Sequence, residues 1–543
     1  PYFIPASVLC LLWLVPGLIG HDPWKPDEAY TFGLVYHLYL GGDWVVPLLA
    51  GEPFMEKPPL FYLTAALFAK IFSFAMPVHD AARLATGFYI AITFVFVGLA
   101  GRELYGRGSG WVAVLMLLGC AGLLVRAHQL ITDAALLTGF AAAIYGHTLA
   151  LRRPSLSGFW LGTGMGIGFM SKGLLEPGMM GLVALMLPVF RHWRNRRYAT
   201  SLLIALIAAA PWLVIWPAVL YARAPELFHN WFWVQNIGRF VGLAHLGPEE
   251  QPLYYLETVP WFAWPVWPFA LWTLWRARRD LLERSEVLLP LVVFVCIFAV
   301  LSIAAEGREV YGLPLLLPLS LLAAARVSTL PRGATNAYYW FAITLGTVFS
   351  AVVWFYWMSL EIGIPERLSR HMNEMQPGYI VGMHPAVVAL AVLCTICWFV
   401  IVFNIKRVPT RPITIWAAGI TTLWVLVALL MVKWIDTGKT YRTMIASLVE
   451  AIPSHQCIYS QSLGEPQRAM LHYFANIFTV RLENPGQRPE CDLLLEQGNW
   501  NDPGEPGGPW KKLWEGSRPG DNKERYRLFQ RRLHSAGAKQ GPQ

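Results

Sequence analysis

The residues best suited to chemistry lie in one stretch that follows the first apolar run of the chain. The acidic pair Asp27 and Glu28 opens a predicted helix there. The helix dipole favours negative side chains in the first turn, which explains one of the two carboxylates without any function. It does not explain a second acidic cluster at Glu52 and Glu56. We therefore predict that residues 27–60 form the seat of the chemistry.

Lys57 gives this stretch a positive group, because it stands between Glu56 and the pair Pro58-Pro59. A carboxylate can hold a divalent cation. An ammonium group can hold a phosphate oxygen. A carboxylate beside a lysine, fixed by prolines at a membrane surface, therefore predicts a phosphate or metal–phosphate site.

Five further polar residues stand near predicted membrane spans, and each has a plain structural alternative. Asp133 lies just inside a span, where a carboxylate is costly and is a functional candidate by default. Lys172 is expected near the outer end of another span, so a structural ion pair with Asp133 is as well founded as direct catalysis. Arg239 and Arg308 either bind phosphate or anchor their segments at the interface. Tyr311 is either part of the site or an ordinary interfacial aromatic residue.

The composition predicts the elements that must position these residues. Of 543 residues, 55% are hydrophobic and 14% are charged, whereas soluble domains carry about 25% charged residues. Apolar runs of span length recur, and they are continuous and not alternating, which favours an all-α membrane bundle over a barrel. The net charge of +9 lies in short basic clusters between these runs. Such clusters are typical of cytoplasmic loops, so we expect no nucleic-acid partner.

The basic clusters also predict the topology. The segment 191–197 is the strongest cluster and is expected in the cytoplasm. A span at residues 59–76 would place that cluster outside, so we predict an interfacial helix there, opened by the proline pair. Residues 1–20 are expected to form a span and not a cleaved signal. The thirteen expected spans cover about residues 2–20, 80–101, 111–126, 130–150, 157–171, 174–190, 200–220, 258–275, 286–304, 310–327, 337–358, 384–404 and 413–434.

Beyond this region the composition becomes polar. We predict a transmembrane domain over residues 1–435, with a first periplasmic loop at 21–79, and a small periplasmic α/β domain over 436–543. The first loop, Asp133 and Lys172 then share the periplasmic face of a bacterial inner membrane. The tail beyond Leu533 is expected to be disordered. The soluble domain is expected to contain strands at 455–460, 491–495 and 526–532 and a helix at 467–476.

Two of the seven cysteines differ from the others. Five lie in apolar spans, where a small buried side chain is the simplest interpretation, and these include Cys394 and Cys397 with their CxxC spacing. Cys457 and Cys491 lie in the predicted periplasmic domain. An oxidising compartment and two neighbouring strands predict a disulfide between them.

Several motifs together resemble the GT-C membrane glycosyltransferases. The most similar pattern is that of the bacterial aminoarabinose transferase family (ArnT), with its relatives among polyprenyl-phosphate sugar transferases. The acidic pair and EKPPL at 56–60 are the most specific of these motifs. The resemblance extends along the whole chain to GDWVVP at 42–47, LITDA at 130–134, SKG at 171–173, NIGRF at 236–240, His245, YYL at 254–256 and EGREVYGLP at 306–314.

The resemblance implies an activity and roles for individual residues. One sugar would pass from undecaprenyl phosphate to an envelope acceptor such as lipid A, at the periplasmic face and with inversion. Asp27 would be the catalytic base, and Lys57 would contact the donor phosphate, whose developing charge must be stabilised. Glu56 and His245 would hold a divalent metal ion, zinc, magnesium or manganese, although a solvated histidine is the default for a polar loop. Further polar positions around the cavity, including donor-phosphate contacts, would be Asp133, Lys172, Arg239, Arg308 and Tyr311.

One departure from the family pattern concerns the substrates. The family usually follows its acidic pair with one residue and then Arg-Tyr, whereas this chain has Tyr30 at the arginine position. Phe54 also stands where a tyrosine is common. We therefore expect the reaction class to be retained, while the sugar and the acceptor stay open.

Three alternatives remain at this stage. A protein acceptor, as in protein O-mannosyltransferases, fits the same class of enzyme. A flippase or transporter for a lipid-linked sugar also explains the spans, but it predicts paired repeats with broken helices and gives no reason for a carboxylate-rich first loop. An O-antigen polymerase or ligase would place its large loop later in the chain.

Overall fold

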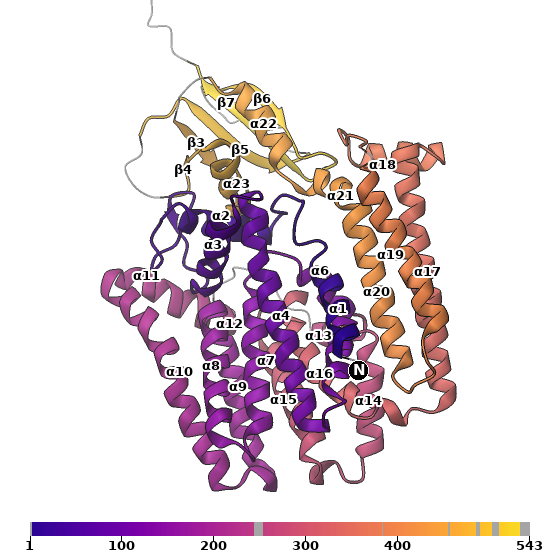
Figure 1. The fold of residues 1–543 in the computed structure, drawn as a ribbon. Coiled ribbons are helices and arrows are strands. Elements are labelled where there is room, and N and C mark those ends of the chain that lie inside the picture. The colour runs from indigo at the N-terminus through magenta and orange to yellow at the C-terminus, as the bar shows by residue number, and fades with distance from the viewer. Residues whose placement is uncertain are drawn as a thin grey trace, which may run out of the picture.

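The computed structural model describes residues 3–243, 253–382, 384–453, 457–484, 489–501 and 510–532. The chain forms a bundle of helices with a small sheet domain at one end (Figure 1). The predicted class, a mostly helical polytopic protein with a small α/β domain, is confirmed at this level. Six of the described helices are long and apolar enough to cross a membrane, namely α4 (Val78–Tyr105), α10 (Arg196–Arg223), α15 (Ser285–Ile303), α17 (Arg332–Ile362), α19 (Pro385–Asn404) and α20 (Arg411–Leu430).

The other predicted spans are shorter helices or helices broken in two, except for α8 (Pro154–Lys172), whose 19 residues are long enough to cross a membrane but less apolar. Trp264-Pro265 separates α13 from α14, because proline has no N–H to continue a helix. The count of thirteen spans therefore stays a prediction. These elements are α1 (Phe3–Leu14), α5 (Gly110–Leu118), α6 (Ala121–Arg126), α7 (Asp133–Leu149), α8 (Pro154–Lys172), α9 (Leu175–Met186), η1 (Leu187–Val189), α13 (Tyr254–Phe262), α14 (Val266–Ala277), η5 (Glu309–Leu315) and α16 (Leu316–Ala325).

Helices α7 and α8 pack so closely that glycine is required between them. A Cβ atom on Gly139 would lie 2.7 Å from the backbone nitrogen of Gly168 and 2.8 Å from the carbonyl oxygen of Gly164. Small residues are the usual means of bringing membrane helices into such contact. The close packing places the first residue of α7, Asp133, beside the last residue of α8, Lys172.

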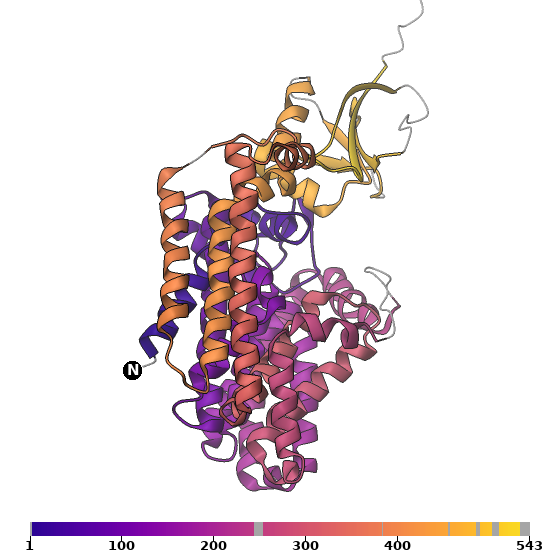
Figure 2. The same cartoon turned by 90° about the vertical axis from the view of Figure 1, so that its right-hand side faces the viewer.

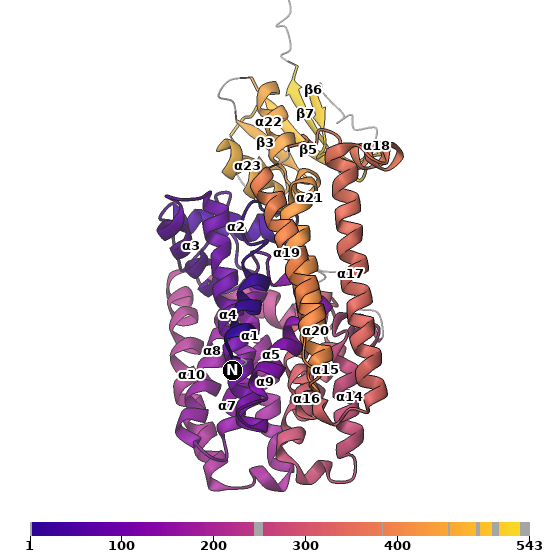
Figure 3. The ribbon, with the colours of Figure 1, turned by 45° about the vertical axis from the view of Figure 1, so that its right-hand side comes forward.

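The first loop folds into two short helices and a small hairpin. These are α2 (Asp27–Tyr39), β1 (Leu48–Leu49), β2 (Glu52–Pro53) and α3 (Leu60–Phe72). Helix α3 begins directly after Pro58-Pro59, as the sequence predicts, and its 13 residues are too few to span hydrocarbon. Figure 3 shows α2 and α3 side by side at the end of α4 that faces the sheet domain. The placement of α3 at a membrane surface stays a prediction.

Three of the long helices form one side of the bundle. Helices α17, α19 and α20 stand together there (Figure 2). Large apolar side chains of α10 and α19, such as Leu206 and Phe403, are exposed, as expected for surfaces against lipid. The connecting elements are η2 (Arg191–Trp193), α11 (Pro225–His229), the π-helical η3 (Asn230–Gly238), α12 (Arg239–Val241), η4 (Leu281–Glu283), η6 (Val327–Thr329) and α18 (Glu366–Met375).

The C-terminal domain is a five-stranded sheet in the order β4-β3-β5-β7-β6. Strand β3 is parallel to β4 and β5, and the last three strands are antiparallel. The predicted boundary between 435 and 436 falls inside α21, and the predicted tail lies outside the described residues. The elements are α21 (Val432–Lys439), α22 (Arg442–Ala451), β3 (Ile458–Gln461), α23 (Glu465–Ala475), β4 (Thr479–Arg481), β5 (Leu493–Asn499), β6 (Trp510–Gly516) and β7 (Glu524–Arg531).

A disulfide joins Cys457 and Cys491, whose Cα atoms are 4.9 Å apart. It links the residue before β3 to the segment that leads into β5, and these two strands are neighbours in the sheet. The pair is the one that the cysteine distribution predicts.

The C-terminal domain holds the first loop in place. The guanidinium of Arg442 donates to the carboxylate of Asp22, with an Nε–Oδ2 distance of 2.8 Å. Arg468 of α23 donates to Glu52 of the hairpin at 2.8 Å. Helix α23 also packs on α2, where the ring of Tyr473 lies edge-on to the buried ring of Phe32. These contacts fix the loop that carries the candidate site.

Candidate functional site

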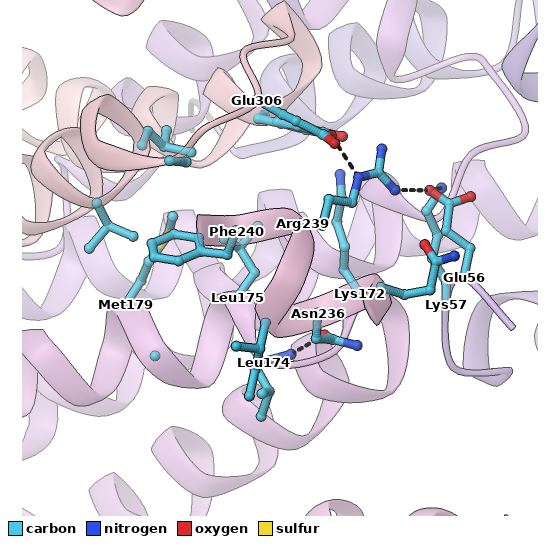
Figure 4. A pocket seen from close by; sticks show the side chains of 17 residues that line it. Glu56, Lys57, Lys172, Leu174, Leu175, Met179, Asn236, Arg239, Phe240 and Glu306 are labelled. Carbon is cyan, nitrogen blue, oxygen red and sulfur yellow. Dashed lines mark hydrogen bonds and ion pairs between the residues drawn. The ribbon is translucent and has the colours of Figure 1, made fainter. Parts of the chain in front are cut away.

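A cavity of about 310 Å³ opens between the first loop, the α8–α9 junction, η3 with α12, and the segment from α15 to η5. Its wall is apolar over most of its length, with residues such as Leu175, Met179 and Phe240 (Figure 4). Charged side chains gather at one end. Five of the residues that the sequence singled out line this cavity, namely Glu56, Lys57, Lys172, Arg239 and Tyr311.

Arg239 is held at the charged end by two carboxylates. Its Nη1 donates to Oε1 of Glu56 at 2.8 Å, and its Nε donates to Oε2 of Glu306 at 2.6 Å (Figure 4). These bonds leave its Nη2 without a hydrogen bond among the described residues. The other oxygen of Glu306, Oε1, is buried and also lacks a hydrogen-bond partner within the described parts of the chain. The guanidinium is thus fixed in place and still has a donor to offer a ligand.

Lys57, which is buried, and Glu56, which is half-buried, form a charged pair. Their charged atoms are 3.8 Å apart, and the ammonium group of Lys57 donates to the hydroxyl of Tyr30 at 2.7 Å. Burial alone would raise the pKa of the Glu56 carboxyl, but Lys57 and Arg239 hold it below its ordinary value. Burial would likewise lower the pKa of Lys57, and the charge of Glu56 raises it instead. Both groups therefore stay ionised at neutral pH.

Asp133 and Lys172 form an ion pair, and the Lys172 ammonium lies 4.1 Å from the ring centre of Tyr311. Their side chains are 8% and 10% exposed, so neither charge is solvated as it would be at a surface. A cation over an aromatic face gains an electrostatic attraction. Lys172 therefore reaches the cavity already oriented by a carboxylate and a ring.

Asp27 and Glu28 have separate environments although they are neighbours in sequence. Glu28 is 1% exposed and accepts hydrogen bonds from Arg83 at 3.0 Å and from the backbone N–H of Leu130 at 2.8 Å. It therefore fixes the first loop to α4 and to the start of α7. The Asp27 side chain is 18% exposed and accepts from Nη2 of Arg308 at 3.2 Å. Asp27 is thus the accessible carboxylate of the pair, although it does not line the first cavity.

Arg308 places a positive group beside Asp27, although Tyr30 stands where the family has an arginine. The sequence predicts the loss of a positive contact near the donor or the acceptor, because Tyr30 stands where the family has an arginine. The structure brings Arg308 to Asp27 from a segment 281 residues away, so a positive group lies beside Asp27 after all. Tyr30 has a different contact, because its hydroxyl accepts a hydrogen bond from Lys57.

The described residues around Glu56 do not by themselves form a site for a divalent metal ion. No group of three or more potential ligands (His, Cys, Asp or Glu) occurs in the described ranges. Glu56 faces Lys57 and Arg239, which repel a cation and attract an anion. The other predicted ligand, His245, lies outside the described residues. Within the described chain, the charged end of the cavity suits a phosphate group better than a metal ion.

Sequence reasoning missed two residues that shape this site. Glu306 begins the motif EGREVYGLP at 306–314, but the motif does not indicate that it is the partner of Arg239. Asn236 accepts a hydrogen bond from the backbone N–H of Leu174 at 3.1 Å and so fixes the α8–α9 junction. A Cβ atom on Gly173 would lie 2.0 Å from the side-chain oxygen of Asn236. The motifs SKG at 171–173 and NIGRF at 236–240 mark the two segments that make this contact, but only the fold shows that these segments meet.

Comparisons with known proteins agree with this arrangement. Residues 56–216 match the family model described as dolichyl-phosphate-mannose-protein mannosyltransferase. The undecaprenyl phosphate-alpha-4-amino-4-deoxy-L-arabinose arabinosyl transferase 1 of Sodalis glossinidius is 30% identical over 59% of this chain and 57% of its own length. The corresponding transferase of Yersinia enterocolitica is 25% identical over 84% of this chain and 81% of its own length. A crystal structure of ArnT from Cupriavidus metallidurans bound to undecaprenyl phosphate superimposes with a TM-score of 0.68, at 15% identity, over 100% of this chain and 99% of that one.

These similarities make the chain a glycosyltransferase and a multi-pass membrane protein that resembles the GT-C enzymes. It has the fold of ArnT, and its sequence is similar to the aminoarabinose transferases along most of its length. The resemblance predicted from the sequence motifs is therefore confirmed.

Proposed function

We propose that this enzyme transfers one sugar from undecaprenyl phosphate to lipid A or a related envelope glycolipid. The observation that carries the proposal is the combination of an apolar wall with three fixed cations, Lys57, Lys172 and Arg239, at one end of a single cavity. Such a cavity suits an amphiphile with a long apolar chain and an anionic head. The names of the Sodalis and Yersinia relatives and the ligand of the Cupriavidus structure support the choice of donor.

The geometry suggests how the donor is activated. An acceptor oxygen attacks the anomeric carbon while the bond from that carbon to the phosphate oxygen breaks. The bonding pair leaves with undecaprenyl phosphate, whose added negative charge Lys57, Lys172 and Arg239 stabilise. Because the three cations are already oriented by Tyr30 and by carboxylates, little reorganisation is needed when the charge develops.

Asp27 is the proposed base. Its carboxylate accepts the proton of an attacking acceptor hydroxyl, and Arg308 orients it by the bond at 3.2 Å. A single displacement of this kind inverts the configuration at the anomeric carbon. The unpartnered Oε1 of Glu306 is placed to accept a hydrogen bond from the sugar, because it is buried at the charged end of the same cavity.

A divalent metal ion held by Glu56 and His245 is a separate proposal, and no step above depends on it. It predicts that chelation inactivates the purified enzyme and that zinc, magnesium or manganese restores the activity. Full activity in the presence of a chelator would exclude it.

We also propose the inner membrane as the location, with thirteen spans and with the cavity and the C-terminal domain on the periplasmic side. Fusions of a reporter that is active only in the cytoplasm test this topology. The proposal expects no signal from a fusion after residue 440 and a signal from a fusion within 191–197. The reverse pattern would overturn the orientation.

The activity is tested with purified protein, undecaprenyl-phosphate aminoarabinose and lipid A. The proposal predicts release of undecaprenyl phosphate, and a loss of at least about 100-fold in kcat for Asp27→Asn, as expected for the removal of a general base. Unchanged turnover by Asp27→Asn would refute the base. The match of residues 56–216 to protein mannosyltransferases favours a protein acceptor as the second candidate. Transfer of the sugar to protein and not to lipid A would support that candidate.

A further inference from the structure

A second cavity lies in the C-terminal domain. Its volume is about 470 Å³, within the range of about 300–1,000 Å³ that is typical of ligand pockets. Helix α22 and strand β6 line it, together with residues 517–522 between β6 and β7. Pro377, which follows α18, completes the lining, and Figure 3 shows α18 beside the sheet domain. The second cavity shares no lining residue with the first cavity.

Two tryptophan side chains give the second cavity flat aromatic surfaces in fixed orientations. The indole N–H of Trp514 donates to the hydroxyl of Ser447 at 2.9 Å. A Cβ atom on Gly516 would overlap the ring of Trp514, so glycine is required there for the ring to lie along the strand. The guanidinium of Arg525 lies 3.6 Å from the ring centre of Trp500 and holds it. Trp500 is nevertheless 42% exposed, so aromatic surface is open to a ligand.

The charges of the second cavity cancel. Its lining contains one cation, Arg518, and one anion, Asp521, and these two form an ion pair. Aliphatic lining side chains are few, namely Met444 and two prolines. The first cavity has three cations at one end and a long apolar wall, whereas the second offers neither an excess of positive charge nor a continuous apolar surface. It therefore does not favour a phosphate group or a lipid chain.

Hydrogen-bonding groups stand beside the aromatic rings. Thr443 and Asn522 are exposed and line the cavity. The hydroxyl of Ser447 accepts from an indole N–H and still has its own hydrogen to donate. The Nε atom of Arg518 is buried and has no hydrogen-bond partner within the described parts of the chain. A buried donor without an acceptor costs free energy, and an oxygen atom of a bound ligand would supply that acceptor.

We infer that the second cavity binds an uncharged saccharide through Trp500 and Trp514. A sugar ring has an apolar face of C–H groups, which packs against the electron-rich face of an aromatic ring. Its hydroxyl groups donate and accept hydrogen bonds, and their partners here are Ser447, Arg518 and Asn522. The inference goes beyond the proposed function, because no step of the sugar transfer uses this cavity. It gives the C-terminal domain a binding role of its own.

The test is saturation-transfer NMR of the full chain with two neutral trisaccharides, maltotriose and the trimer of N-acetylglucosamine. The detergent must lack a sugar headgroup, because a maltoside would compete for the cavity. The wild type is expected to bind at least one trisaccharide saturably. Trp500→Leu is expected to weaken this binding by about tenfold, as truncation of an aromatic anchor does. Asn522→Ala, on the exposed loop, is expected to weaken it less.

Trp510→Leu is the matched control, because it removes a tryptophan from the same strand, β6, without touching the cavity. It is expected to bind as the wild type does, and thermal unfolding reports that the variants are folded. Saturable binding of neither trisaccharide by the wild type would overturn the inference. An unchanged affinity in both Trp500→Leu and Asn522→Ala would overturn it too, as would tighter binding of an acidic tripeptide than of either trisaccharide.

Discussion

Replacing Lys57 by methionine removes one of the three cations proposed to stabilise the donor phosphate while keeping a side chain of similar length. The Lys57 side chain is 10% exposed, and its ammonium lies 2.7 Å from the hydroxyl of Tyr30 and 3.8 Å from Glu56. Loss of one preorganised group that stabilises a developing anion costs about 2.7–4 kcal/mol, or about 10²–10³-fold in kcat. We expect a fall in kcat within this range.

The effect of Lys57→Met on folding is expected to be smaller than its effect on catalysis. Glu56 keeps its hydrogen bond to Arg239 at 2.8 Å, so its carboxylate is not left without a partner. The stability cost is then that of one buried hydrogen bond, about 1–3 kcal/mol, and not the larger penalty of an isolated buried charge. Thermal unfolding in detergent measures this difference.

The assay for Lys57→Met is the release of undecaprenyl phosphate, followed with the purified variant at saturating donor. Lys70→Met is the matched control, because Lys70 is an exposed lysine of α3, in the same loop and outside the cavity, and its activity should equal that of the wild type. A folded Lys57→Met enzyme with more than about a tenth of the wild-type kcat would refute the reasoning, since the loss would then be below about 1.4 kcal/mol.

Two further predictions follow from the structure. Lys172→Met leaves Asp133 buried without its partner, so we expect about 3–5 kcal/mol of destabilisation. The double variant with Asp133→Asn should recover the stability but not the activity, and recovery of both would show that the pair is only structural. Burial and the nearby charge of Asp22 raise the pKa of the Asp436 carboxyl to about 6. Because a raised folded-state pKa stabilises the protein only at low pH, Asp436→Asn should be more stable than the wild type at pH 8, by up to about 3 kcal/mol. That advantage should shrink as the pH falls through about 6 and vanish below about 4; an advantage independent of pH in thermal unfolding would contradict it.

The larger elements of this fold could be predicted because their signals are local. Apolar runs of sufficient length mark the long membrane helices, and the proline pair marks the start of α3 at Leu60. Strands β4 (Thr479–Arg481) and β6 (Trp510–Gly516) were missed. The first is very short, and the second contains two lysines and a glutamate, so neither has the apolar pattern by which strands are recognised.

The site was predictable in its members but not in its pairings. Lys57, Lys172 and Arg239 were each singled out from motifs, and the fold brings them to one cavity. Their carboxylate partners come from distant segments, and neither the bond from Arg239 to Glu306 nor that from Arg308 to Asp27 leaves a trace in local sequence. Long-range contacts of this kind depend on how the helices pack.

The central claim is that the three-cation cavity binds an undecaprenyl-phosphate sugar and that the sugar is passed to an envelope glycolipid. The most direct measurement is mass spectrometry of lipid A after incubation with the purified enzyme and undecaprenyl-phosphate aminoarabinose, with Asp27→Asn as the inactive control. We predict that lipid A gains the mass of one sugar with the wild type, with an equal amount of undecaprenyl phosphate released, and that neither occurs with the variant. Unmodified lipid A together with intact donor in the wild-type reaction would contradict it.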